Sequence, residues 1–114
     1  MSAFFVDLDG TLFHFGTNFL TPGARDLLTW IEENGHQLIL TTRRGDGYEG
    51  HKIFDKDKTL EALKVRGIKY EAILFGIHSP RIVINDEECE AFQIPKDKGT
   101  SEVLGFLKGE TSES

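Results

Sequence analysis

The sequence contains one cysteine, Cys89, among its 114 residues. A single cysteine cannot form a disulfide within the chain, and no paired Cys/His spacing indicates a structural zinc site. These absences exclude a disulfide-stapled scaffold and a zinc finger. They are typical of a reducing compartment, so we expect a cytoplasmic protein that folds on its hydrophobic core alone.

Long apolar runs and an excess of positive charge are lacking too. The apolar runs reach about five residues, whereas roughly 20 are needed to span a bilayer, and neither terminus resembles a signal peptide. We therefore expect no membrane partner. The formal charge of −6 argues against non-specific binding of nucleic acid, which depends on clustered Lys and Arg. Arg43-Arg44 with His51-Lys52 is a local basic cluster, and such short clusters are usually solvated loops.

The composition present is that of one ordinary globular domain. Hydrophobic residues make up 39% of the chain and charged residues 28%. This balance, at this length, predicts a single domain over residues 1–109 and a frayed tail over 110–114.

Short apolar segments alternate with segments of helical periodicity. The apolar segments predict strands, and the periodic segments, with their capping residues, predict helices. The expected strands are 3–6, 37–40, 72–75, 81–84 and 91–94, and the expected helices are 21–35, 58–66 and 100–108. This alternation predicts an α/β fold with a parallel sheet covered on both faces. The loop over residues 43–52 holds three glycines and is expected to be mobile.

Polar residues follow three of the expected strands. Asp7 and Asp9 end the first strand and, because strand side chains alternate, project to the same side. Thr41-Thr42 ends the second strand, and Asn85-Asp86 follows the fourth. Since ligands of open α/β sheets bind at the carboxyl ends of the strands, we expect these groups to share one pocket.

Three carboxylates in one pocket would repel one another unless their pKa values rise or a cation lies among them. Oxygen ligands favour a hard ion, and Mg²⁺ suits a site with few protein oxygens that also accepts a phosphate oxygen. The sequence thus predicts a Mg²⁺ site on Asp7, Asp9 and Asp86. Taken singly, each feature has an ordinary reading as a turn, a strand end or a helix cap.

The pattern resembles the haloacid dehalogenase-like superfamily of aspartate-nucleophile phosphotransferases. Its first motif, Asp-x-Asp-Gly-Thr, matches residues 7–11; its second resembles residues 38–41, and its fourth resembles residues 82–86. The resemblance implies a three-layer, Rossmann-like fold with strand order 3-2-1-4-5. It also implies a Mg²⁺-dependent phosphatase that acts on phosphomonoesters.

By resemblance, Asp7 attacks phosphorus to form an aspartyl-phosphate, and Asp9 is the general acid and base. Thr41, with Thr42, binds the phosphoryl group. Mg²⁺ is held by Asp7, Asp86 and the backbone carbonyl of Asp9.

The family's third motif, a lysine, is absent: residues 75–80 read Phe-Gly-Ile-His-Ser-Pro. Arg81, His78, Arg43 and Lys58 are the candidates to replace its charge, and Arg81 is our predicted phosphate ligand. The connections are too short for a cap domain, so Leu12 to Leu20 forms only a flap. An uncovered site suits a large substrate that brings its own surface, or closure by a second copy of the chain. The phosphorylated substrate itself is either a small molecule or a macromolecular end. Phe13, Phe15 and Phe19 either make that contact or pack beneath the flap.

Two other functions compete with the phosphatase. One is a pseudoenzyme of the same fold that binds phosphate or metal without turnover, favoured by the missing lysine and by Asn85 in a position where an acid is common. The other is a receiver-type signalling domain, which also uses clustered aspartates and Mg²⁺. A receiver carries its acceptor aspartate after a middle strand, so Asp7 at the first strand argues against that reading.

Overall fold

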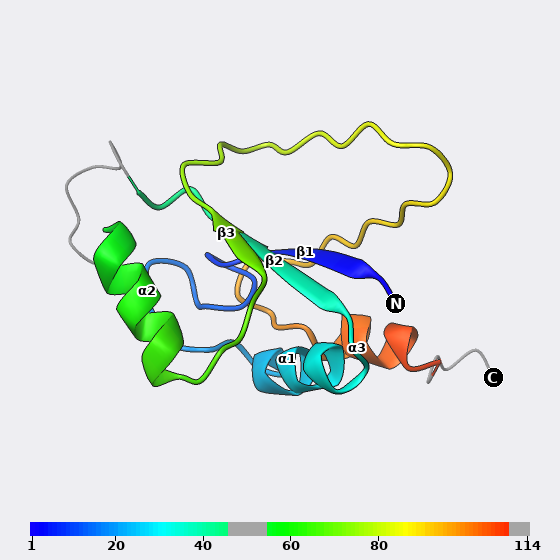
Figure 1. Ribbon diagram of the computed structural model, residues 1–114, viewed down its shortest axis with the longest axis horizontal. Helices are drawn as coiled ribbons and strands as arrows, with labels where there is room; N and C mark the ends of the chain where they lie inside the picture. The colour runs from blue at the N-terminus through cyan, green and yellow to red at the C-terminus, as the bar shows by residue number, and fades with distance from the viewer. Residues whose placement is uncertain (46–54, 110–114) are drawn as a thin grey trace.

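The computed structural model describes residues 1–45 and 55–109, which form a small α/β unit (Figure 1). Strands and helices alternate along the chain. The elements are β1 (Ala3–Asp7), α1 (Ala24–Glu33), β2 (Gln37–Thr41), α2 (Lys56–Val65), β3 (Ala72–Leu74) and α3 (Ser101–Leu107). Most of the loop predicted to be mobile, and the predicted tail, lie outside the described residues.

The three strands form a parallel sheet in the order β1-β2-β3. The pairing puts Asp7 opposite Thr41, and Thr41 opposite Leu74. These residues therefore share one face at the carboxyl edge of the sheet, because partners in a parallel pair project to the same side. The order of the first three strands agrees with the prediction.

The hydrophobic core lies on the other face of the sheet. Val6, Leu38 and Leu40 point into it from the strands, and Leu28 and Ile31 meet them from α1. Two successive crossovers in one direction place α1 and α2 on the same side of the sheet. Figure 1 shows α1 and α3 below the strands, and Leu63 and Leu104 bring α2 and α3 into the same core.

The start of α1 differs from its prediction by about three residues. The helix was predicted from residue 21, but it begins at Ala24, after Gly23 with φ +78°. The Thr21 hydroxyl donates to the carbonyl oxygens of Thr11 (2.5 Å) and Leu12 (3.3 Å) instead. Thr21 therefore ties the flap, residues 12–20, to the start of α1.

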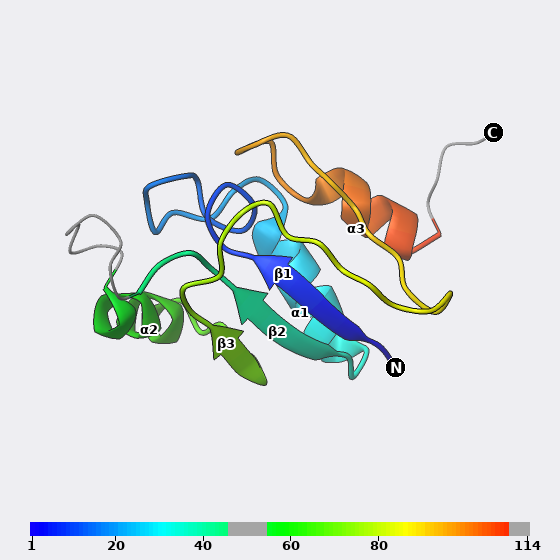
Figure 2. The same cartoon turned by 90° about the horizontal axis from the view of Figure 1, so that it is seen from above.

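The two strands predicted over 81–84 and 91–94 are absent from the structure. Residues 76–96 contain no strand. The first part of this stretch runs on the side of the sheet opposite α1 (Figures 1 and 2), and its later part returns to α3, where the Phe92 and Phe106 rings lie 5.3 Å apart. Ile82, Val83 and Ile84 are 81%, 72% and 93% exposed. An apolar run expresses a preference for a half-buried pleated surface, but a strand forms only where another strand pairs with it. Cys89 lies exposed in the same stretch.

No helix within residues 1–45 and 55–109 is long and apolar enough to cross a membrane.

Candidate active site

Asp7 lies at the carboxyl end of β1 with a positive charge beside it. Arg81 Nη1 is 3.1 Å from Asp7 Oδ1, and the Thr11 hydroxyl lies 3.5 Å from Oδ2. Burial raises the pKa of Asp7 above its usual 3.8; the charge of Arg81 opposes this rise, and that of Asp9 adds to it. The Asp7 side chain remains 29% exposed, so it is accessible from solvent.

Arg81 reaches Asp7 because the start of the irregular stretch is pinned to the end of β2. The backbone N–H of Gly76 donates to the carbonyl of Arg44, and that of Ile77 donates to the carbonyl of Thr42. The Ile77 carbonyl in turn accepts a 3.0 Å hydrogen bond from Arg81 Nη2. The guanidinium group is therefore oriented by the backbone as well as by the carboxylate it pairs with.

Asp9 occupies a different environment from Asp7, two residues away. Its carboxylate accepts three hydrogen bonds from the Arg44 guanidinium: Nη2 to Oδ1 at 2.8 Å, and Nε to Oδ1 at 3.0 Å and to Oδ2 at 3.2 Å. The Thr42 hydroxyl donates to Oδ2 at 3.0 Å. Only 13% of the Asp9 side chain is exposed, so its position is set almost entirely by the protein.

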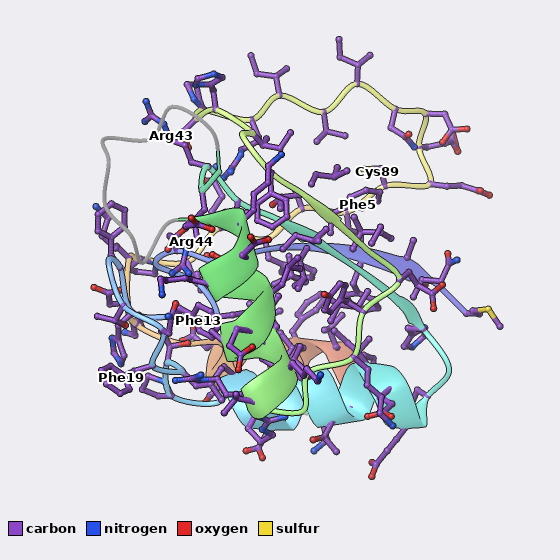
Figure 3. The ribbon with its side chains drawn as sticks, turned by 60° about the vertical axis from the view of Figure 1, so that its left-hand side comes forward. Phe5, Phe13, Phe19, Arg43, Arg44 and Cys89 are labelled. Carbon is purple, nitrogen blue, oxygen red and sulfur yellow. The ribbon has the colours of Figure 1, made fainter. Side chains whose placement is uncertain are left out.

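For Arg44 the sequence predicted the wrong environment. Arg44 belongs to a basic cluster read as a solvated loop, yet it is fully buried. Its Nη1 also donates to Asn18 Oδ1 (2.6 Å) and its Nη2 to the carbonyl of Thr17 (2.7 Å). Figure 3 shows Arg44 between α2 and the flap. The sequence of two adjacent arginines does not indicate which one is buried, because the partners of the buried arginine come from distant segments.

The two threonines after β2 have different surroundings. Thr41 shares the open face with Asp7 and is partly exposed, as a phosphate ligand requires. Thr42 is fully buried; besides donating to Asp9, its hydroxyl accepts the Arg44 backbone N–H at 3.0 Å. The arrangement therefore does not support the prediction that Thr42 contacts a phosphate.

Within the described residues, Asp86 does not join Asp7 and Asp9 in a metal-binding group. It is exposed within the irregular stretch, and its Oδ1 accepts local hydrogen bonds from Asn85 Nδ2 (3.1 Å) and the Glu88 N–H (3.0 Å). No group of three or more His, Cys, Asp or Glu side chains in the described ranges is arranged to hold a metal. Asp7 and Asp9 each face a guanidinium group. The expected Mg²⁺ ligands are therefore not assembled, because their convergence required a strand over 81–84.

The flap and the segment before α3 meet next to the Asp9-Gly10 turn. Phe13 is fully buried in the core, as one of the two readings expected, whereas Phe15 and Phe19 are 48% and 69% exposed. The Asp97 N–H donates to the Gly10 carbonyl (2.8 Å), and its Oδ1 accepts the Phe15 N–H (2.6 Å). Lys96 Nζ lies 4.2 Å from the centroid of the Phe15 ring. The sequence analysis did not predict that this segment contacts the Asp9-Gly10 turn.

Comparison with known proteins identifies a fold but no family. No protein-family model matches the chain, and no curated protein matches it. Among solved structures, it is similar to the crystal structure of a structural-genomics target from Vibrio cholerae, with a TM-score of 0.58 and 21% identity. That match covers 97% of this chain and 100% of the other. At this identity the likeness concerns the fold alone, and the description of that protein states no activity.

Proposed function

We propose that this chain is a phosphomonoester hydrolase of the haloacid dehalogenase-like type that works through an aspartyl-phosphate on Asp7. The observation that carries the proposal is the pairing of Asp7 with Arg81 at 3.1 Å, on a face that it shares with Thr41. A nucleophile, a cation and a hydroxyl are thus held at one sheet edge. Arg81 takes the part of the missing lysine, since it can bind a phosphoryl oxygen and offset its charge.

In the first step, an Asp7 oxygen forms a bond to phosphorus while the phosphorus–oxygen bond of the ester breaks. The leaving oxygen takes a proton from Asp9. In the second step, Asp9 takes a proton from water as the water attacks phosphorus, which releases inorganic phosphate and restores the Asp7 carboxylate. Arg81 and Thr41 hold the phosphoryl oxygens in both steps.

Mg²⁺ belongs to this proposal as the cofactor that the family resemblance implies, where it would supply further positive charge at the phosphate. The described arrangement does not fit it, since Asp86 does not join Asp7 and Asp9 in a metal-binding group. Among the described residues β1 pairs with β2 alone. If residues 81–84 paired along the other edge of β1, and residues 91–94 paired beside them, the strand order would be 3-2-1-4-5. Asp86 would then end beside Asp7.

The test is a rapid-quench experiment on the full chain with an aryl phosphate, with and without Mg²⁺. Intact-mass analysis should find a labile gain of about 80 Da, the mass of one HPO₃ group, in the parent protein. Asp7→Asn should abolish both this adduct and turnover, whereas Asp26→Asn, an exposed aspartate in α1, should leave them unchanged. Parental activity in purified Asp7→Asn would refute the nucleophile assignment.

A phosphate-binding pseudoenzyme is the second candidate, favoured by the pairing of both aspartates with arginines. Binding of inorganic phosphate that Arg81→Ala weakens, together with no turnover of aryl or alkyl phosphates, would decide for it. Arg81→Ala should lower turnover if the chain is an enzyme, and Arg81→Lys should restore part of it.

A further inference from the structure

Arg44 joins three parts of the chain that are distant in sequence. Its guanidinium group binds the Asp9 carboxylate, the flap through Thr17 and Asn18, and α2 through Thr59 Oγ1 at 3.3 Å. Its Cζ also lies 5.3 Å from the centre of the buried Phe13 ring. Few side chains make so many directed contacts, and a planar guanidinium holds its partners at fixed angles.

Burying this charged guanidinium group is unfavourable in free energy, and packing of the core does not require a charged residue at this position. Arginine is almost never fully buried unless it is paired, and apolar residues of similar volume often give equal or better stability at such positions. The flap atoms that Arg44 binds, Asn18 Oδ1 and the Thr17 carbonyl, belong to residues that are partly exposed to solvent. The network therefore relates the position of the flap to the position of Asp9.

We propose that Arg44 is a positioning residue that couples the flap to the acid–base function of Asp9. When Asn18 and Thr17 hold Nη1 and Nη2, the remaining Nε and Nη2 contacts fix the Asp9 carboxylate in the plane of the guanidinium. If Asn18 and Thr17 move away from Arg44, the guanidinium can rotate, and Asp9 loses its alignment with the leaving oxygen. This inference rests on the proposed function, because it assigns a role within that reaction.

The chain offers a variant that loosens the flap end without touching Asp9 or Arg44. Asn18→Ala removes the 2.6 Å acceptor of Nη1. Asn34→Ala is the matched control, because Asn34 caps α1 through a 2.8 Å bond to the Trp30 carbonyl and is exposed. Asn18→Asp tests rescue, since a carboxylate can accept the same hydrogen bond.

The first measurement does not depend on catalysis. Denaturation midpoints of Asn18→Ala, Asp9→Asn and the double variant form a double-mutant cycle. Coupling through Arg44 should make the midpoint shift of the double variant clearly smaller than the sum of the single shifts. Additive shifts would overturn the physical link, whatever the enzyme does.

The second measurement separates positioning from general loss of structure. Asn18→Ala should lower kcat/KM about tenfold for an alkyl phosphate, whose leaving group needs a proton, and less than about twofold for 4-nitrophenyl phosphate. In an Asp9→Asn background it should add nothing further. Asn18→Asp should recover most of the alkyl phosphate rate, and Asn34→Ala should match the parent on both substrates.

The outcomes distinguish this inference from the proposed function. Equal losses on both substrates would overturn the positioning role while leaving the phosphatase in place. If neither substrate is turned over by the parent protein, the proposed function fails and the catalytic role of Arg44 fails with it. In that case a coupled stability cycle would still show the link between flap and Asp9, but as a structural one.

Discussion

Replacing Arg44 with methionine should destabilise the protein more than any other arginine substitution outside the open face. The change keeps a long side chain but removes the side-chain hydrogen bonds that Arg44 donates to Asp9 and to the flap. Removing one partner of a buried ion pair typically costs about 3–5 kcal/mol, because the other charge stays buried. Since 13% of the Asp9 side chain remains exposed to water, we expect the lower part of this range, about 3 kcal/mol.

For a domain of about 100 residues, each kcal/mol shifts the melting temperature by roughly 4–8 °C, so Arg44→Met should lower it by about 12 °C or more. Arg44→Lys keeps the charge but loses the planar guanidinium that binds the carboxylate with two nitrogens. Its melting temperature should lie between those of Arg44→Met and the parent. Arg25→Met is the control: Arg25 is exposed and binds the Arg66 carbonyl, and its loss should stay near 0.5 kcal/mol.

Thermal melts followed by circular dichroism at one pH and salt concentration would measure these differences. The double variant Asp9→Asn with Arg44→Met should melt closer to the parent than the sum of its single changes, because it leaves no unpaired charge. A melting temperature of Arg44→Met within about 3 °C of the parent would refute the reasoning, since it would mean that the ion pair contributes less than 1 kcal/mol.

Other measurements test the remaining features. Burial raises the folded-state pKa of Asp7, so ionisation of Asp7 opposes folding above that pKa. Asp7→Asn should therefore be more stable than the parent at pH 7. The urea midpoints of the parent and of Asp7→Asn should converge as the pH falls towards 3.8. Gly99→Ala should be strongly destabilising, since φ is +104° and a Cβ would lie against the Pro22 carbonyl; Gly35→Ala, at φ +71° with open space, should cost only about 1 kcal/mol. If Mg²⁺ binds the folded state, millimolar Mg²⁺ should raise the melting temperature of metal-free protein, and Asp86→Ala should remove the effect. An unchanged melting temperature of the parent would instead leave Asp86 without a metal role.

Regular elements with strong local patterns were predicted closely. β1 and β2 follow from continuous apolar runs, and α2 and α3 were predicted within about two residues of their bounds. Apolar spacing, capping residues and glycines act over a few residues, so the chain needs no distant contact to express them. The placement of Asp7 and Thr41 at one sheet edge follows from the same patterns, because parallel strands end together.

Tertiary structure decided which partners those residues meet. Arg81 approaches Asp7 across 74 positions, and Arg44 approaches Asp9 across 35. The apolar run over 82–84 has the composition of a strand, yet it stays exposed because none of the strands within residues 1–45 and 55–109 pairs with it. Sequence alone thus determined which segments can be helix or strand, and that Asp7 and Thr41 end at one edge of the sheet. Pairing, burial and ion pairs depend on contacts between distant segments, whose energies no local pattern contains.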